Sequence, residues 1–379
     1  MDIICFCHLR WNFVYQRPQH LLSRFAYQYR VFVIEEPLFD AKVSYVEISL
    51  SKENVWVIIP HLSKDLDTDH ITREQQILVK KFFADFSIGD YIAWFYTPMA
   101  LSIYESVPRA KLVVYDCMDE LSAFKNAPAG ISQMESLLLE KADLVFTGGY
   151  SLYEAKQHQH PAVFPFPSSI DKAHFSKARR DTIPPMDQVN IPRPRIGFFG
   201  VIDERFDIDL LKNTAELKPG WQFVIIGPTV KIDPASLPKA SNIHYLGSKS
   251  YEELPAYLAG WDVAMIPFAR NESTRYISPT KTPEYLAGGV PVVSTSIQDV
   301  VTPYGKEKLV YIADDPEEFI KGVEWSLSNK NNPAWLKPVD DFLTNISWDV
   351  TWLKMILLIQ SKLKANQSRN LTTKENEYV

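Results

Sequence analysis

Two successive runs of alternating strand-like and helix-like segments constrain the fold of this 379-residue chain more than any other feature. In the first run, short apolar or β-branched stretches alternate with stretches of helical spacing. Such alternation favours a mostly parallel sheet covered by helices. The predicted strands cover residues 2–7, 30–35, 55–60, 91–96, 111–115 and 143–147, and the predicted helices cover residues 17–29, 73–86 and 131–142.

The alternation returns after residues 168–194, where proline, serine and charged residues interrupt the periodicity. The second set of predicted strands covers residues 195–201, 221–226, 243–246, 263–267, 291–295 and 309–312, with helices over 251–259 and 315–328. Because single hydrophobic cores stop growing well below this chain length, two domains are expected. We predict an N-terminal Rossmann-like domain over 1–172, a linker over 173–194 and a C-terminal Rossmann-like domain over 195–346, facing a central cleft.

The end of the chain predicts one further helix. Ser347 is a suitable N-cap, and residues 347–365 have helical spacing of apolar side chains. The side chains that would share one face are Trp348, Trp352, Met355, Ile356, Ile359 and Leu363. Residues 366–379 are polar and are expected to be disordered.

Composition excludes several classes of protein. A net charge of −6 argues against nucleic-acid binding, which usually needs a basic face. No continuous apolar run reaches the ~18–20 residues that span a bilayer. The first residues lack a basic leader and a small-residue cleavage site, so they predict a strand of a cytoplasmic protein. Cys5 and Cys7 share one face of that strand, a spacing that suits neither a disulfide nor a metal site.

Residues 277–297 carry the strongest functional signal, because a polar loop there opens a helix that ends at Gly-Gly before a β-branched strand. Free backbone N–H groups at a helix start bind anions, so we predict a phosphate cradle within residues 278–282. We expect either Thr282 as the N-cap, with Pro283 at the favoured first position, or a tightened first turn. Glu284 would then accept hydrogen bonds from ribose hydroxyls. The alternative is an ordinary helix–strand turn.

Other residues near the second-domain strands suit phosphate binding. Gly200, in the loop after residues 195–199, lets the backbone approach a ligand closely. Arg205 offers a fork of donors to a diphosphate, and Lys281 offers a point cation. A surface salt bridge for Arg205 and a solvated side chain for Lys281 are the alternatives.

The N-terminal domain is expected to supply the acceptor side, because the carboxyl ends of parallel strands face the crevice in open α/β sheets. The loop after residues 2–7 offers Arg10, Trp11, Tyr15, Gln16 and Arg17 as acceptor contacts. Arg17 opposes the helix dipole, a cost that a nearby anion would offset.

Two acidic residues, Asp116 and Asp119, follow the predicted strand over 111–115. A carboxylate in a cleft can move protons or face a transferred sugar. The alternative for either residue is a capping acid at the start of the next segment. Single histidines such as His8 and His20 are interpreted as incidental.

Taken together, these segments resemble retaining glycosyltransferases of the GT-B architecture, close to glycosyltransferase family 4 and its bacterial polysaccharide-biosynthesis members. Residues 164–171 resemble the end of that family's N-terminal domain, although Ser168 and Ser169 replace the usual Asn-Gly. The family carries two glutamates in the donor segment. Glu284 matches the second, whereas Tyr276 occupies the position of the first.

The resemblance implies transfer of a sugar from a nucleotide-diphosphate sugar, first of all a UDP-sugar, to a glycan or lipid-linked acceptor with retention of configuration, in bacterial surface polysaccharide synthesis. It implies that the last helix crosses back onto the N-terminal domain. It also implies no metal or other cofactor, with a lipid-linked acceptor drawing the protein to the inner face of the membrane. The implied catalytic residues are Asp116, Asp119, Arg205 and Lys281, and the implied donor contacts are Gly200, Asn271, Thr274, Ser278, Thr280, Thr282 and Glu284.

Two other functions stay open at this point. A sugar-nucleotide epimerase of the same architecture would also bind a nucleotide sugar between two Rossmann-like domains. A non-catalytic GT-B protein that binds a glycan or a partner is the second alternative. Tyr276, in place of the usual glutamate, keeps that alternative open. Nothing in the sequence indicates an oligomeric state.

Overall fold

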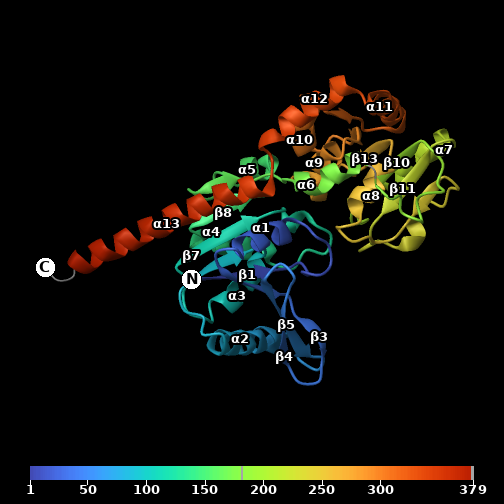
Figure 1. Cartoon of the computed structure of the whole chain (residues 1–379). Coiled ribbons are helices and arrows are strands. Elements are labelled where there is room, and N and C mark those ends of the chain that lie inside the picture. Colours follow the sequence, from blue (N-terminus) through green and yellow to red (C-terminus); the bar gives the residue numbers. More distant parts are fainter. Residues whose placement is uncertain (181, 377–379) are drawn as a thin grey trace.

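The computed structural model describes residues 1–180 and 182–376, and these form two α/β lobes with a long helix lying along the N-terminal one (Figure 1). Each lobe is built on its own sheet, and the first sheet has nine strands in the order β3-β5-β2-β1-β6-β7-β8-β9, with β4 paired to β5. All pairs are parallel except the β4–β5 pair. The strands are β1 (Asp2–Cys7), β2 (Arg30–Glu35), β3 (Leu38–Ala41), β4 (Tyr45–Leu50), β5 (Val55–Ser63), β6 (Tyr91–Phe95), β7 (Leu112–Cys117), β8 (Leu144–Thr147) and β9 (Val163–Pro165).

Helices cover both faces of this sheet because its central strands are apolar on both sides. Ile3 and Cys5 of β1 pack toward α1, whereas Ile4 and Phe6 pack toward α2. The helices of this half are α1 (Arg17–Phe25), α2 (Thr68–Asp85), α3 (Leu101–Tyr104), α4 (Ile131–Lys141), α5 (Tyr150–Lys156) and α6 (Lys172–Phe175). The described cysteines, including Cys5 and Cys7, are buried and free of disulfides.

The C-terminal sheet is wholly parallel, in the order β12-β11-β10-β13-β14-β15. Its strands are β10 (Arg195–Phe199), β11 (Gln222–Ile226), β12 (Ile243–Tyr245), β13 (Val263–Ile266), β14 (Val292–Ser294) and β15 (Val310–Ile312). The helices around it are α7 (Ile208–Leu217), α8 (Leu254–Ala259), α9 (Lys281–Ala287), α10 (Gln298–Val300), α11 (Pro316–Asn329) and α12 (Pro333–Phe342). The order of this sheet places the ends of β10 and β11 beside the start of α9, where the site is built.

The last helix, α13 (Trp348–Asn376), returns to the N-terminal domain, as the sequence predicts (Figure 1). Ser347 caps it, since its hydroxyl accepts a hydrogen bond from the Val350 N–H at 3.1 Å. Trp348, Met355 and Ile359 are fully buried in the same core cluster as α1. The hydrophobic face of α13 therefore stabilises the N-terminal lobe rather than the domain that precedes it in sequence.

The structure corrects three expectations about the chain's organisation. Strands β3 and β4 lie in a region where the sequence analysis predicts no strand, because half-exposed edge strands give only a weak apolar signal. The segment predicted as a linker packs on the C-terminal domain, where Phe175 and Ile191 join the core. The tail predicted to be disordered is helical up to Asn376, because helix propagation from a packed first half needs only ordinary helix formers. Residues 377–379 lie outside the described part.

One helical stretch bears on the expectation that no apolar run spans a membrane. One helical stretch, Pro333–Ser368, is long and apolar enough to cross a membrane by length and composition, and 28% of its most apolar window is buried. The stretch has no continuous apolar run, but the mean hydropathy of its most apolar window is 1.3. In the structure its buried face packs on protein, as described for α13.

Candidate active site between the two domains

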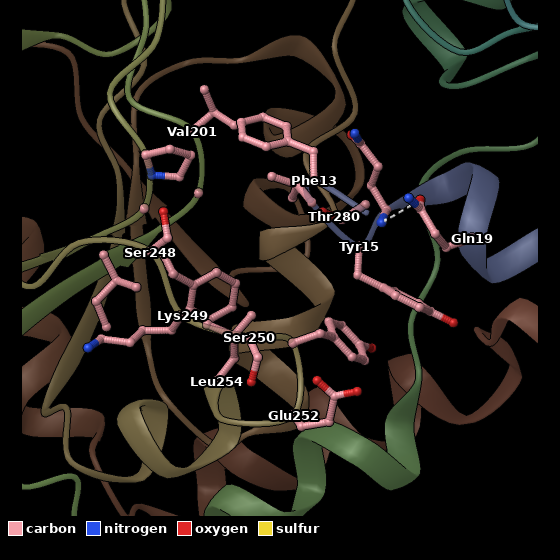
Figure 2. A pocket seen from close by; sticks show the side chains of 18 of the residues that line it. Phe13, Tyr15, Gln19, Val201, Ser248, Lys249, Ser250, Glu252, Leu254 and Thr280 are labelled. Carbon is pink, nitrogen blue, oxygen red and sulfur yellow. Dashed lines mark hydrogen bonds between the residues drawn. The ribbon is translucent and has the colours of Figure 1, made fainter. Parts of the chain in front are cut away.

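A cavity of about 550 Å³ lies between the two lobes, at the carboxyl ends of β1, β10 and β11. This is the edge at which open α/β sheets bind ligands. Figure 2 shows the contributions of both domains: Phe13, Tyr15 and Gln19 from the N-terminal domain, and Val201, Ser248 and Thr280 from the C-terminal domain. The predicted site residues that line the cavity are Trp11, Tyr15, Gln16, Gly200, Arg205, Thr280, Lys281 and Glu284.

Two glycine turns shape the C-terminal wall. Gly200, directly after β10, has φ +144°, and Gly227, directly after β11, has φ +139°. A Cβ on Gly227 would lie 1.8 Å from the Gly200 carbonyl oxygen, and one on Gly200 would lie 2.2 Å from Lys281 Cε. Both positions therefore need glycine, and the Lys281 side chain lies directly over the Gly200 turn.

Lys281 and Glu284 face the cavity from the first turn of α9 with their charges unpaired. Among the described residues, neither the Lys281 ammonium nor the Glu284 carboxylate makes an ion pair within 4.0 Å or a side-chain hydrogen bond. Burial and the charge of Arg205 together lower the pKa of Lys281 to about 8, against the opposing effect of Glu284. Burial raises the pKa of Glu284 to about 7, against the charge of Lys281. Such charges are costly unless a ligand pairs with them.

Arg205 is only half available to a ligand. Asp203 accepts from its Nε and Nη2 at 2.6–3.1 Å, and the guanidinium lies over the Phe124 ring at 5.4 Å. Within the described residues, Nη1 makes no hydrogen bond. Arg205 thus presents one donor group to the cavity, held in place by the buried Asp203 carboxylate.

Helix α9 begins two residues earlier than predicted. Thr280, not Thr282, is the N-cap, and Pro283 is the third helical residue. Proline is tolerated there because the first N–H groups of a helix have no intrahelical partner. Thr282 is buried, and its hydroxyl has no hydrogen-bond partner in the described structure. Thr282 is therefore not among the residues that line the cavity.

Three other predicted donor residues hold the protein together instead. Ser278 receives hydrogen bonds from Ser168 and so ties the two domains. Asn271 and Thr274 close the turn before this segment, with the Asn271 N–H donating to Thr274 Oγ1 at 3.1 Å. The polar groups of all three are used within the protein, and none of the three lines the cavity.

The buried Arg17–Asp116 pair is the largest correction. The Arg17 guanidinium donates to both Asp116 oxygens at 2.7–3.1 Å and to the Phe166 carbonyl at 2.7 Å. Side-chain exposure is 4% for Arg17 and 0% for Asp116. The pair therefore neutralises itself beneath the cleft, and neither residue lines the cavity.

Arg10 is also used within the protein. It pairs with Glu35 at 3.0 Å and donates to the carbonyls of Glu36 and Pro37. Glu35 in turn accepts the Trp11 N–H at 2.7 Å, which holds Trp11 in the cavity wall. Arg10 thus positions the loop and does not line the cavity.

Asp119 lies beyond the lining residues, partly buried at the carboxyl end of β7. Burial raises the pKa of its carboxyl to about 6, whereas the charges of Arg205, Arg17 and Lys281 lower it. His8, interpreted from the sequence as incidental, follows β1. Burial lowers its pKa to about 4, and its Nδ1 is buried without a partner in the described structure. Because His8 follows β1 and Asp119 follows β7, both residues lie at the carboxyl edge of the N-terminal sheet.

Sequence reasoning missed two parts of the wall. Residues 248–252 follow β12, and the turn at residues 51–53 joins β4 to β5. Tyr251 stacks on Tyr15 across the domain interface, with ring centroids 4.6 Å apart. The rule that strand carboxyl ends face the crevice could have found residues 248–252, because a short β-type run precedes them.

Tyr276 also contributes to the domain interface. It stands where the resembled family carries its first glutamate, and it packs against the core of the N-terminal domain. Its ring lies 5.2 Å from the Arg275 guanidinium carbon. Across residues 1–180 and 182–376, no cluster of three or more His, Cys, Asp or Glu side chains could hold a metal ion.

Comparison with known proteins agrees with this architecture. Residues 193–329 match the family model described as Glycosyl transferases group 1. TuaH of Bacillus subtilis, named as a proposed teichuronic acid biosynthesis glycosyltransferase, is 28% identical over 146 residues. That match spans 37% of this chain and only 36% of TuaH.

Solved structures match over nearly the whole chain. The Escherichia coli trehalose-6-phosphate protein bound with UDP-2-fluoro glucose has a TM-score of 0.67 at 11% identity, over 96% of this chain and 99% of that chain. Sucrose-phosphate synthase from Thermosynechococcus elongatus has a TM-score of 0.68 at 14% identity, over 96% of this chain and 100% of that chain. Anabaena HepE in complex with UDP has a TM-score of 0.64 at 12% identity, over 95% of this chain and 100% of that chain.

These likenesses define the class. The chain has the GT-B fold predicted from the sequence, with the last helix crossing back onto the N-terminal domain. Residues 193–329, which make up most of its C-terminal domain, are similar to the glycosyl transferases group 1 family model.

Proposed function

We propose that this protein transfers a glycosyl group from a nucleotide-diphosphate sugar to a glycan or lipid-linked acceptor, with retention at the anomeric carbon. The observation that carries the proposal is the unpaired Lys281 and Glu284 side by side in the cavity between the domains. A nucleotide-diphosphate sugar combines phosphate charge, which suits an ammonium, with ribose hydroxyls, which suit a carboxylate.

The same wall supplies what the transfer step needs. The acceptor oxygen forms a bond to the anomeric carbon on the face from which the diphosphate departs. The bond from that carbon to the diphosphate oxygen breaks, and the acceptor proton passes to the leaving diphosphate. Lys281 and Nη1 of Arg205 stabilise the charge that grows on that group. Asp119 lies beyond the lining residues, and its electrostatic interactions with Arg205 and Lys281 support a place for it near the transferred sugar.

UDP-sugars are the first donors to test, since two proteins of the same fold are known with UDP-2-fluoro glucose and with UDP. By its name, TuaH points to surface polysaccharide synthesis. An acceptor carried on a lipid would place this protein in the cytoplasm, at the inner face of the membrane. Leu353 and Leu357, 49% and 64% exposed on the outer side of α13, would contact the lipid.

The decisive experiment follows nucleotide release from UDP-, GDP-, ADP- and dTDP-sugars with and without a glycan acceptor, alongside thermal shifts with each donor. The expected result is one preferred donor and release that rises when acceptor is present. Lys281→Met should lose this activity, whereas Lys321→Met, an exposed lysine paired with Glu318, should keep it. Release that does not depend on acceptor would contradict transfer.

The same assay separates the alternatives. An epimerase would change the sugar without an acceptor, and a non-catalytic binding protein would shift thermally without turnover. Comparing the anomeric configuration of donor and product by NMR tests retention. We expect activity to survive EDTA, and its loss with recovery on added divalent metal would contradict metal independence.

A further inference from the structure

A second large cavity lies at the opposite end of the C-terminal sheet. Its volume is about 620 Å³, and it is bounded by the start of β10, the end of α8, Gly288–Gly289 after α9, and the α11–α12 connection. Arg195 begins β10, and Asp262 directly precedes β13, so this cavity is at the amino ends of strands whose carboxyl ends form the donor cavity. We call it the rear cavity.

The rear cavity is strongly basic. One carboxylate, that of Asp262, faces five cationic side chains of the wall. These cations are Arg179, Arg180, Arg193, Arg195 and Lys330. In a protein whose net charge is −6, this concentration of positive charge is local and opposite in sign to the whole chain.

Three of the arginines are already held by the protein. Arg195 donates to the carbonyls of Ile191 and Val189, at 2.7 Å from Nε and 3.0 Å from Nη2. Arg193 pairs with Asp262, whose other oxygen accepts the Arg195 N–H at 2.8 Å. Arg179 pairs with Asp340 at 2.8 Å from outside the cavity wall. The nearby carboxylates are therefore already paired with arginines.

Lys330 has no such partner. Within the described residues its ammonium makes no ion pair or hydrogen bond, and it sits partly buried at the end of α11. Burial lowers its pKa to about 8, with Asp262 opposing the shift and Arg193 adding to it. A partly buried ammonium among arginines, with no counter-ion of its own, has a free energy cost that a bound anion would remove.

We propose that the rear cavity is a binding site for a small phosphate-bearing ligand, with Lys330, Arg193 and Arg180 as phosphate contacts. Guanidinium forks and an ammonium together match phosphate oxygens in both geometry and charge. The cavity is of the size that encloses a small organic ligand, so a phosphorylated sugar would fit beside the bound phosphate. The inference is independent of the donor cavity and of the function proposed for it.

The test is calorimetric titration of the full-length protein with inorganic phosphate and, separately, with glucose 1-phosphate. Saturable binding of at least one probe is expected. Lys330→Met should weaken it by at least ~10-fold, the scale of a charged hydrogen bond, and Lys330→Arg should largely retain it. Lys281→Met, which alters the donor cavity, should leave this binding unchanged and so separates the two sites.

A second measurement follows the number of protons taken up on phosphate binding. Because phosphate favours the charged ammonium, binding at pH 8.5 should take up protons, as measured in buffers of different ionisation enthalpy, and Lys330→Met should abolish this uptake. Binding that Lys330→Met leaves unchanged while Lys281→Met removes it would assign the phosphate to the donor cavity and overturn the proposal. Absence of saturable binding of both probes would overturn it as well.

Discussion

The two domains use polar residues at strand ends in different ways. In the C-terminal domain, the charged groups of Lys281 and Glu284 reach the cavity and, among the described residues, make no ion pair or side-chain hydrogen bond. In the N-terminal domain, Arg17 pairs with Asp116 and Arg10 with Glu35, so the charges neutralise one another beneath or beside the cleft. The same kind of sequence signal thus marks charged groups that line a cavity in one domain and a structural ion pair in the other.

The difference teaches what strand-end position does and does not determine. Topology brings the carboxyl ends of parallel strands to one edge, so a polar residue there will lie near the crevice. Whether it faces a ligand depends on whether a residue of opposite charge arrives from another strand end. Arg17 and Asp116 are 99 residues apart, and spacing along the chain does not show that they meet.

The largest expected effect tests the buried pair. Arg17→Met should lower the free energy of unfolding by about 3–5 kcal/mol, because it leaves a buried carboxylate unpaired. Urea denaturation measures this change. The double variant Arg17→Met with Asp116→Leu should recover most of the loss, since no buried charge is then left. A stable Arg17→Met protein that fails only in acceptor binding would restore the role predicted from the sequence.

Much of the fold could be predicted from the sequence, because the alternation of buried strands and amphipathic helices is a local signal. Strand β1, which is apolar on both faces, and the face of α13 that carries Trp348 are examples of such local signals. Strands β3 and β4 could not be predicted, since half-exposed edge strands such as Tyr45–Leu50 depend on pairing with β5. The Thr280 cap was missed because helix starts depend on tertiary packing.

The candidate site likewise contains residues whose position could be predicted from the sequence and residues whose position could not. Gly200, Lys281 and Glu284 were predictable because turn chemistry and helix position fix where they point. Ser278 and Thr274 were not, because hydrogen bonds to nearby backbone or to the other domain compete with ligand contact. Sequence shows which residues are polar at the edge, and only packing decides which remain unpaired.

The next effect concerns the free ammonium in the C-terminal wall. If Lys281 stabilises charge on the leaving diphosphate, Lys281→Met should lower turnover by roughly 10²–10³-fold, the scale for losing one such contact. Affinity for a nucleoside without phosphate should change little. Arg205→Met should cost less, because Asp203 already binds half of its donors. Equal losses of turnover and nucleoside affinity would contradict this assignment.

Replacing Glu284 should affect nucleotide binding and the pH dependence of stability in opposite directions. Glu284→Gln should weaken nucleotide binding by ~1–3 kcal/mol, measured by calorimetry, because a charged hydrogen-bond acceptor is lost. Burial raises the pKa of this carboxyl to about 7, so the folded state holds its proton more tightly than the unfolded state. Ionisation therefore costs stability as the pH rises from about 5 to 8.

The glutamine variant lacks this ionisation, so its stability should fall less over that pH range than that of the unmodified protein. Thermal unfolding across the range provides the measurement, with Lys321→Met as a variant remote from the cavity. Unchanged nucleotide affinity in a folded Glu284→Gln protein would remove Glu284 from the donor site.

The smallest expected effect returns to the N-terminal loop. Arg10 is partly exposed, whereas its partner Glu35 is buried and keeps the Trp11 N–H as a second contact. Arg10→Ala should therefore lower the free energy of unfolding by only about 1 kcal/mol. Arg275→Ala is the matched control, because the Arg275–Glu272 pair is exposed and 3.7 Å apart, and no measurable change is expected there. If Arg10→Ala left stability unchanged in urea and abolished glycosyl transfer, Arg10 would contact the acceptor, and the contrast between the two domains would not hold at this position.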